Sequence, residues 1–442
     1  MPKTILLRIG TAAMIGLLLA GFSPVRAGAG EEALTAEQKE LNRQSFEMVW
    51  STIRDKHYDP TLGGLDWNAV HAELLPEMEA ATTMDEARQV LRKIIARLEL
   101  SHFNIIPGHL FAEMGTEESA TSMDDGITGL DVRYLDGLAL VTAVEPGSPA
   151  ALAEIQTGWA ITHIGQTELA PLLDKLHQEF AGRTLHDAVL ASVVKGRLNG
   201  PVGETVTVTF LDGEDKSVTK EIVRIDPPGQ KYRLGYLPPF HVWIKTRPLD
   251  GNIGYIAFNA FMDPVQLMPK FNEAMQQFMT ADGLIIDLRG NGGGLPNMAT
   301  GMAGWLIDRK NLHLGTVYYR DSELKIIVRP RPEIFKGPVA VLIDGLSASC
   351  SEFMAGGLKD LDRARIFGST TAGAALPSIV VKLPNGDGFQ YAFANYRSAG
   401  GDVLEGNGVT PHEPIMPARA ALLQGEDPVL DGAVAWIKSQ GK

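Results

Sequence analysis

The first quarter of the chain shows the apolar periodicity of helices. Between Glu32 and Leu100, apolar side chains recur every three or four residues, which places them on one face of a helix. Two breaks, Tyr58-Asp59-Pro60 and Gly63-Gly64, consist of residues that favour turns. We therefore predict a small helical domain with three apolar stripes: Phe46, Val49, Trp50 and Ile53; Trp67, Val70 and Leu74; Ala87, Val90, Leu91 and Ile94.

The pattern changes to short strands between residues 127 and 226. Alternating apolar residues predict strands near 141–144 and 158–165, and then at 205–210 and 218–223. A longer helical segment, 172–198, precedes the last two strands. Pro227-Pro228-Gly229 then has the composition of a linker, so a second domain is expected to end there.

From Tyr232 onward, strands alternate with helices. Residues 254–258 predict a strand, and 264–279 predict an amphipathic helix. Two later runs, 283–288 and 339–343, have the largely apolar pattern that is typical of strands covered on both faces. This alternation predicts a mixed α/β core.

A serine-rich turn joins the second apolar run to a helix. The run ends at Asp344-Gly345, the small residues 347–351 follow, and helical spacing begins near Ser351. Such a junction holds a side chain in a sharp turn while the first N–H groups of the helix stay unbonded, which suits a serine nucleophile beside an anion site. The alternative is a simple helix cap, because serine caps many helices.

A glycine-rich loop follows the first apolar run, with the sequence Arg-Gly-Asn-Gly-Gly-Gly from Arg289 to Gly294. It matches neither phosphate-binding fingerprint, because no Gly-Lys-Ser/Thr ends it and Leu295 stands where the third glycine of a dinucleotide-binding loop belongs. We therefore expect exposed backbone amides that bind an oxyanion.

Together, the loop DLRGNGGG and the turn SASCSE resemble those of the carboxyl-terminal-processing, or tail-specific, serine peptidases and their tricorn-type relatives. The resemblance covers nearly the whole chain after residue 27. It implies an α/β multidomain protein with an N-terminal helical domain, a PDZ-like domain and a crotonase/ClpP-like β-α spiral core. It also implies that Ser349 is the nucleophile. The oxyanion hole then consists of the amides of Cys350 and of either Gly292 or Gly293.

The chain departs from one pattern of that family. Members with a Ser-Lys dyad carry a lysine 25 positions after the nucleophile, and this chain has Ala374 there. Lys382 lies eight residues beyond that place, too far to inherit the role. The general base is therefore expected elsewhere.

The resemblance to the tricorn-type members implies which residue is the general base. These members have a Ser-His pair after the N-terminal helices, and Ser101-His102 occupies that place here. A glutamate in their closing motif orients the serine of the pair, and Glu405 in EGNGVTP matches it. The implied catalytic set is Ser101, His102, Ser349 and Glu405, with His102 as the base. From the residues alone, three alternatives stay open: His102 as a structural histidine, His109 as the base, and Glu405 as a loop acid bonded to backbone amides.

The start of the chain resembles a secretory signal. Lys3 and Arg8 precede an apolar core, and Val25-Arg26-Ala27 resembles a cleavage site. We therefore expect a signal peptide over residues 1–27 and an exported protein, periplasmic or extracellular; a retained signal anchor is the alternative.

The rest of the chain is expected to divide into a helical domain (28–103), a hairpin or lid (104–126), a PDZ-like domain (127–226) and a peptidase core (227–442). PDZ domains bind a peptide's C-terminal end as an added strand at the edge of their sheet. Two departures, Gly158-Trp159 in place of Gly-Asp and the insertion at 172–198, leave a structural spacer as the alternative.

Composition and net charge limit the kinds of partner and cofactor that the protein is expected to bind. The net charge of −13 argues against nucleic acid or an anionic membrane surface. Cys350 is the only cysteine, so no intrachain disulfide forms. The ten histidines are scattered and no HExxH or CxxC motif occurs, so neither a metal site nor another cofactor is expected.

The favoured function is an exported serine endopeptidase that cleaves peptides or protein C-terminal tails by acyl transfer. The rival is a protein of the same fold that binds peptides without catalysis, or that hydrolyses small esters or amides. Loss of the lysine favours the binding protein. The joint presence of Ser349, the glycine loop, His102 and Glu405 favours the enzyme.

Overall fold

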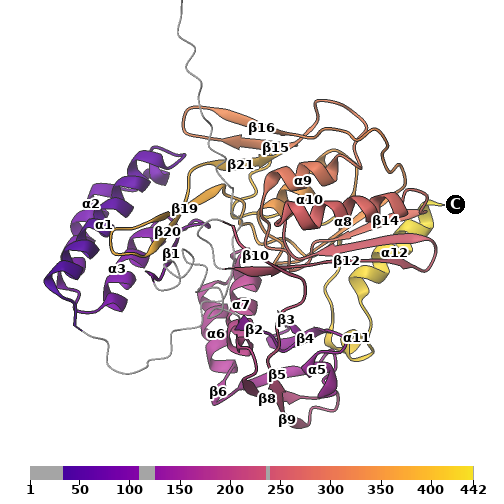
Figure 1. The fold of residues 1–442 in the computed structure, drawn as a ribbon, viewed down its shortest axis with the longest axis horizontal. Helices are drawn as coiled ribbons and strands as arrows, with labels where there is room; N and C mark the ends of the chain where they lie inside the picture. Colours follow the sequence, from indigo (N-terminus) through magenta and orange to yellow (C-terminus); the bar gives the residue numbers. More distant parts are fainter. Residues whose placement is uncertain (1–32, 109–124, 235–238, 442) are drawn as a thin grey trace, which may run out of the picture.

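The computed structural model of the protein describes residues 33–108, 125–234 and 239–441. Within these ranges the elements form three groups, each with its own hydrophobic cluster (Figure 1). Three predictions concern other parts of the chain: the signal at 1–27, the candidate base His109 and most of the lid at 104–126 lie outside the described residues.

The N-terminal group is helical, as predicted, and the residues of its three apolar stripes pack into one cluster. Its elements are α1 (Ala36–Lys56), η1 (Leu62–Gly64), α2 (Trp67–Ala80) and α3 (Met84–Ala96). Thr35 and Thr83 begin α1 and α3 with reciprocal capping boxes, in which each threonine and a later Gln or Glu satisfy one another's backbone amides. The turn η1 lies at the predicted Gly63-Gly64 break.

A hairpin from far along the chain completes this group. It consists of β19 (Ser378–Lys382) and β20 (Gly388–Ala392), and β1 (Asn104–Ile106) pairs antiparallel with β20. Figure 1 shows the hairpin beside the N-terminal helices, and its apolar side chains share their cluster. The prediction of a local hairpin starting at residue 104 is therefore wrong for β1, whose partner lies 286 residues away.

A buried ion pair fastens the hairpin to α3. Arg88 donates from Nε and NH2 to Asp387 at 3.1 and 3.0 Å, and the Asp387 side chain is fully buried. Asp387 also accepts hydrogen bonds from Asn385 and from the amide of Gly108. These contacts offset the cost of removing the carboxylate from water.

The second group is an antiparallel sheet with strand order β3-β4-β5-β8-β9. Its strands are β3 (Leu130–Leu135), β4 (Leu138–Val144), β5 (Ala160–Ile164), β6 (Thr167–Glu168), β8 (Thr205–Leu211) and β9 (Ser217–Val223), with β2 (Asp125–Gly126) paired to β7 (Gly200–Pro201) beside it. The short helix is α5 (Pro149–Leu152), and the segment 172–198 contains α6 (Ala170–Glu179) and α7 (His186–Leu198). Helix α7 packs beside β3, the strand at one edge of the sheet.

The third group is the α/β core, built on a six-stranded sheet of order β12-β13-β14-β17-β18-β22 that is parallel except for β12. Its strands are β12 (Ile244–Leu249), β13 (Ile253–Phe258), β14 (Gly283–Asp287), β17 (Val339–Ile343), β18 (Arg365–Gly368) and β22 (Glu413–Pro414). The predicted bounds of β17 are confirmed, and β14 begins at the predicted residue and ends one residue before the predicted end.

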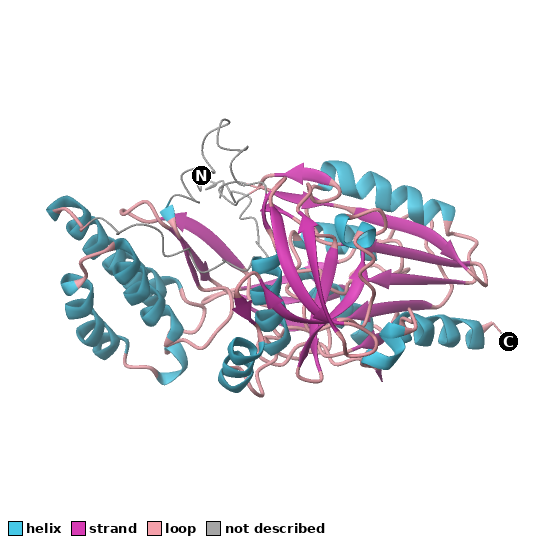
Figure 2. Ribbon diagram, turned by 90° about the horizontal axis from the view of Figure 1, so that it is seen from below, coloured by secondary structure: helices cyan, strands magenta, loops and turns pink. Residues whose placement is uncertain are grey.

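Helices cover both faces of this sheet (Figure 2). One face packs against α8 (Pro264–Gln277), α9 (Pro296–Ala303) and α10 (Cys350–Asp360), and the other against α12 (Pro428–Gln440). Every residue of β14 and β17 is buried as a result, which explains their largely apolar runs. The remaining elements are β10 (Gln230–Tyr232), β11 (Phe240–Val242), α11 (Arg419–Leu423) and the sheet of β15 (His313–Tyr318), β16 (Glu323–Ile327) and β21 (Asn395–Ser398).

Candidate active site

Ser349 lies in the turn between β17 and α10, as predicted, and the helix begins at the next residue. Its backbone has φ 54° and ψ −116°, a conformation that few residues other than glycine adopt. The turn is held because the Ser349 amide donates to Ala374 O and to Glu352 Oε2, both at 2.9 Å. Strain held by its surroundings in this way is typical of functional positions.

A buried carboxyl group, Glu352, supports the turn from within the core. It accepts hydrogen bonds from the amides of Ser349, Gly373 and Ala374 at 2.8 to 3.0 Å, and from Thr371 Oγ1 at 2.6 Å. Burial raises the pKa of Glu352 to about 8, and these hydrogen bonds oppose the rise. No sequence motif predicted a role for Glu352. The signal that could have found it is the Ser-x-x-Glu spacing of a capping box beginning at Ser349.

The glycine loop lies directly beside Ser349. A Cβ atom on Gly293, whose φ is +97°, would lie 2.7 Å from Ser349 Cβ and 2.8 Å from Cys350 N, so a larger residue does not fit. The Gly293 amide donates to Asn291 Oδ1 at 2.9 Å. Across the described ranges, the amides of Gly292 and Cys350 have no hydrogen-bond acceptor. The amides of Gly292 and Cys350 therefore remain unbonded next to Gly293 and Ser349, respectively.

Ser101 and His102 lie between α3 and β1, and they form a hydrogen-bonded group with Glu405. Ser101 Oγ is 2.7 Å from His102 Nδ1 and donates to Glu405 Oε2 at 2.9 Å. The Ser101 amide donates to the other carboxylate oxygen at 2.7 Å. A serine hydroxyl has one proton, so Ser101 Oγ accepts from Nδ1–H of His102. The lone pair of His102 then lies on Nε2, which is the tautomer that a general base needs.

Burial keeps this histidine neutral. His102 is 1% exposed, and loss of solvation lowers its pKa to about 3. Within the part of the chain that the structure describes, its Nε2 atom is buried and has no hydrogen-bond partner. Burial also raises the pKa of Glu405, while its hydrogen bonds to Ser101 and Ala375 act in the opposite direction.

One short segment connects the two halves of the site. The amides of Gly373 and Ala374 donate to Glu352, beneath Ser349, and the next amide, Ala375, donates to Glu405 at 3.0 Å. The structure thus brings together two sets of the predicted residues: Ser349 with Cys350, Gly292 and Gly293, and Ser101 with His102 and Glu405. Among the described residues, no hydrogen bond joins Ser349 to His102.

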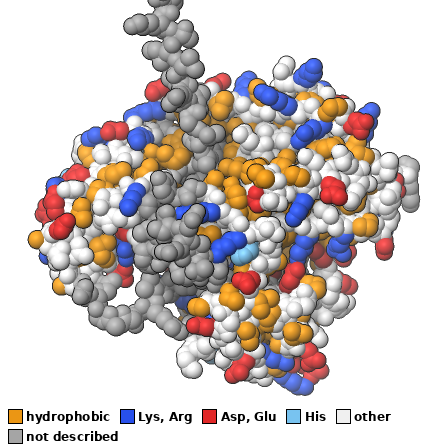
Figure 3. Space-filling view, in the orientation of Figure 1, with side chains coloured by type: hydrophobic (Ala, Val, Ile, Leu, Met, Phe, Trp, Pro, Cys, Tyr) orange, Lys and Arg blue, Asp and Glu red, His pale blue; other side chains and the backbone are white. Residues whose placement is uncertain are grey.

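A cleft of about 760 Å³ opens beside the glycine loop. Gly292 and Ala348 line it from the core, and Leu130 and Tyr134 of β3 line it from the second group. Figure 3 shows acidic and basic side chains interspersed with apolar ones on one face of the molecule, without a single-sign patch of the kind that nucleic acid needs.

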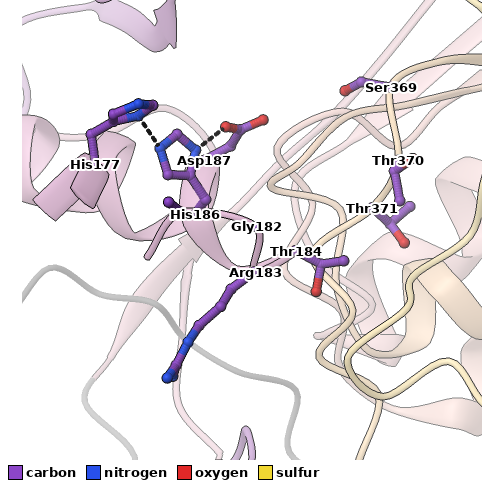
Figure 4. Close-up of a pocket in the computed structure, with 10 residues that line it drawn as sticks. His177, Gly182, Arg183, Thr184, His186, Asp187, Ser369, Thr370 and Thr371 are labelled. Atoms are coloured by element: carbon purple, nitrogen blue, oxygen red, sulfur yellow. Dashed lines mark hydrogen bonds and ion pairs between the residues drawn. The ribbon is translucent and has the colours of Figure 1, made fainter. Parts of the chain in front are cut away.

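A second hollow, of about 400 Å³, lies between the α6–α7 turn and residues 369–371 (Figure 4). There His186 contacts Asp187 through Nδ1 and His177 through Nε2, both at 2.8 Å. In the described ranges, none of the predicted catalytic side chains lines this hollow.

The described residues contain no group of three or more His, Cys, Asp or Glu side chains placed to hold a metal ion. They also include no helix with the length and apolar character needed to span a membrane.

Two family models match the chain. Peptidase family S41 matches residues 252–415, which contain the glycine loop, the Ser349 turn and Glu405, and the tricorn protease C1 domain matches residues 38–96.

Two curated relatives match this chain over most of their own length. The chloroplastic carboxyl-terminal-processing peptidase 2 of Arabidopsis thaliana is 27% identical over 84% of this chain and 68% of its own length. The carboxyl-terminal-processing protease of Picosynechococcus sp. is 24% identical over 95% of this chain and 93% of its own length.

Solved structures have a similar mixed α/β fold. The photosystem II D1 C-terminal processing protease superposes with a TM-score of 0.55 at 21% identity, over 90% of this chain and 99% of the other. Mature CPAF superposes with a TM-score of 0.64 at 16% identity, over 92% and 99%. The match of residues 252–415 to peptidase family S41, the similarity to carboxyl-terminal-processing peptidases and the serine at the strand-to-helix turn together indicate that the chain is a serine-type peptidase.

Proposed function

We propose that the protein is an exported endopeptidase that cleaves peptides or protein C-terminal tails by a Ser-His mechanism. In this proposal Ser349 is the nucleophile and His102 the general base. Ser101 and Glu405 orient the imidazole ring. The hydrogen-bonded group of Glu405, Ser101 and His102 carries the proposal, because it fixes a neutral imidazole with its lone pair on Nε2.

Acylation begins when Ser349 Oγ attacks the scissile carbonyl carbon and His102 Nε2 takes its proton. The imidazolium that forms keeps its Nδ1–H bond to Ser101, whose hydroxyl connects it to the carboxylate of Glu405. Glu405 therefore offsets part of the cost of a positive charge in a buried place. His102 then gives the proton to the leaving amine, and water repeats the sequence on the acyl-enzyme.

The oxyanion hole in this proposal consists of the amides of Cys350 and Gly292. Both are unbonded in the described part of the protein, whereas the Gly293 amide already donates to Asn291. Gly293 contributes space instead, because a side chain there would collide with Ser349. Two amides directed at the developing negative charge stabilise the tetrahedral intermediate.

We also propose that Ser349 and His102 approach hydrogen-bonding distance only when substrate is bound. Catalytic hydrogen bonds are often long in free enzymes and shorten in the complex. The unpartnered Nε2 atom of His102 supports this, because a buried acceptor without a donor is costly and a substrate-bound serine hydroxyl would satisfy it.

The second group of elements is proposed to be a PDZ-like domain (127–226) between a helical domain (28–103) and a crotonase/ClpP-like core (227–442). Its edge strand β3 lies beside α7 and lines the same cleft as Gly292. A peptide added to β3 as a strand would therefore run along the cleft that Gly292 and Ala348, the residue before Ser349, line. Export rests on the signal-like pattern of residues 1–27.

The test is covalent labelling with a fluorophosphonate probe, followed by mass spectrometry of the modified peptide. We expect labelling at Ser349 in the parent protein, none in Ser349→Ala and strongly slowed labelling in His102→Ala. Cleavage of unfolded β-casein should follow the same order. Labelling at a different serine, or cleavage by Ser349→Ala, would contradict the proposal.

A further inference from the structure

The glycine loop is tied to the C-terminal helix through Arg289. The guanidinium of Arg289 donates from NH1 and NH2 to the two carboxylate oxygens of Asp427, each at 2.8 Å. On its other side, Nε and NH2 donate to Asp287 at 3.0 and 2.6 Å. Asp287 is the last residue of β14, and Asp427 is the N-cap of α12, where it accepts from Leu430 N at 3.1 Å.

This arrangement leaves Arg289 little freedom. Each carboxylate takes a paired contact from the planar guanidinium, a geometry that fixes orientation as well as distance. Tyr255 Oη donates to Asp287 at 2.8 Å and holds that carboxylate in turn. The Asp427 side chain is 36% exposed, and the guanidinium outweighs the effect of burial and lowers the pKa of Asp427. Asp427 is therefore ionised at neutral pH.

Hydrogen bonds to neighbouring segments hold most of the residues that follow Arg289. The amide of Gly290 donates to Asp344 at 2.9 Å, and Asn291 Nδ2 donates to Phe258 O at 2.7 Å. The amide of Gly293 is bonded to Asn291. Gly292 has no such anchor among the described residues, so the direction of its amide depends on the segments on either side.

We propose that Asp427 is a positioning residue for the oxyanion hole, acting through Arg289 on the amide of Gly292. The inference rests on the proposed function, because it assigns Asp427 a role in stabilising the oxyanion. Asp287 alone fixes one side of the guanidinium. Asp427 fixes the other side, and it belongs to a helix on the opposite face of the sheet from α10, which carries Ser349 at its N-terminus.

The test compares Asp427→Asn with Asp431→Asn, which makes the same chemical change one helical turn later, at an exposed side chain that has no hydrogen bond or ion pair to any described residue. The substrate is β-casein, with its most frequently cut bond mapped by mass spectrometry. The probes are the peptide aldehyde and the peptide alcohol built on the four residues before that bond. Only the aldehyde forms a tetrahedral adduct with Ser349, so the ratio of the two inhibition constants measures oxyanion stabilisation.

We expect Asp427→Asn to lower kcat about tenfold with KM within twofold, because deleting an oxyanion donor outright costs about 10²- to 10³-fold and a displaced donor costs less. The inhibition constant of the aldehyde should rise in proportion, and that of the alcohol should not change. Asp431→Asn should match the parent in every readout.

An unchanged aldehyde-to-alcohol ratio, or an equal loss of both ligands, would overturn the inference. Asp427→Ser separates the cap from the ion pair, since serine caps α12 equally well but is too short to hold Arg289. Asp427→Ser should therefore lower kcat and weaken aldehyde binding at least as much as Asp427→Asn does. If neither variant folds, Asp427 is a structural residue and the inference fails. If the parent itself does not distinguish aldehyde from alcohol, the proposed Ser-His function fails instead.

Discussion

The carbonyl oxygen of Ala374 accepts a hydrogen bond from the amide of Ser349 at 2.9 Å. Ala374 stands where members with a Ser-Lys dyad carry their lysine. It is fully buried, next to the turn that contains Ser349. The position that supplies an amine in those members therefore supplies a methyl group and a backbone acceptor here. Lys382, exposed at the end of β19, does not replace it.

Ser349→Ala should abolish peptide cleavage while the fold persists. Removal of a nucleophile costs several orders of magnitude in rate, whereas loss of one hydroxyl at a helix start costs about 1 kcal/mol. Turnover of a cleaved peptide and the melting temperature check the two parts of this expectation.

Cys350→Ala is the matched control, since only the amide of Cys350 is assigned a role. Its thiol donates to Gly294 O at 2.8 Å and burial raises its pKa, so it is an inert packing group. Loss of activity in this variant beyond the effect of packing would place the thiol in the mechanism.

The acid limb of kcat/KM should lie well below pH 6. An unperturbed histidine predicts a limb near 6.5, but burial lowers the pKa of His102 to about 3. Activity should then stay level from pH 7 down to about 5 and fall only at lower pH. His102→Ala should lose activity, whereas His109→Ala should keep both activity and limb. If only His109→Ala were inactive, His109 rather than His102 would be the general base.

The same buried histidine should make stability depend on pH. Between pH 6.5 and about 3 the unfolded chain binds a proton at His102 that the folded protein excludes, so the free energy of unfolding falls as pH falls through this window. His102→Gln should remove this component. Urea unfolding of both proteins at pH 7 and pH 5 measures it: an equal decrease in both would show that His102 is not the group responsible.

Ser101→Ala should reduce kcat about 10- to 100-fold without unfolding the protein. The substitution removes the acceptor of His102 Nδ1–H and the connection to Glu405, so the ring loses its fixed tautomer. Ser101→Thr keeps the hydroxyl and should retain much of the activity. Equal losses for Ala and Thr would point to packing at this buried position as the cause.

Glu352→Gln should destabilise the protein by about 1–3 kcal/mol above pH 8, where a group with a pKa of about 8 is ionised. The carboxyl group of Glu352 accepts from three backbone amides and a hydroxyl, and a glutamine NH₂ would face donors at one of its two positions. Chemical denaturation measures the change, and Glu426→Gln at the exposed surface is the control. A stability equal to that of the parent would indicate that Glu352 is protonated and already donates a hydrogen bond.

A free C-terminal carboxylate should lower the KM of a cleaved peptide. Strand addition at β3 reads the end of a peptide chain, so amidation of that end should raise KM and leave kcat little changed. Kinetics on a matched acid and amide pair provide the measurement. Equal KM values would make the proposed PDZ-like unit a spacer.

Local patterns in the sequence were sufficient to predict many of the helices and strands of this fold. The bounds of β17, and those of β14 to within one residue, follow from largely apolar runs, because few polar residues interrupt a strand covered on both faces. The start of α10 differs from its prediction by a residue, since Ser349 adopts a strained conformation that spacing does not reveal. The positions of Ser349, Ser101-His102 and Glu405 depended on family motifs rather than on periodicity.

Features that depend on distant pairing could not be predicted. The partner of β1 lies 286 residues away, and three residues of strand contain too little pattern to identify it. The preference for Gly292 over Gly293 as an oxyanion donor depends on a single hydrogen bond within the loop, that of Asn291. Three adjacent glycines give no indication of which amide is already bonded.

The pairing of β1 with β20 also has a consequence for the order in which the proposed catalytic group forms during synthesis. Ser101 and His102 leave the ribosome long before Glu405, 304 residues later in the chain, and before the hairpin against which β1 packs. Under the proposed mechanism, a nascent chain therefore contains the base before the groups that orient it, and contacts of such long sequence separation form late. Proteolytic activity is then expected to arise only after synthesis has passed Glu405 and the hairpin has folded.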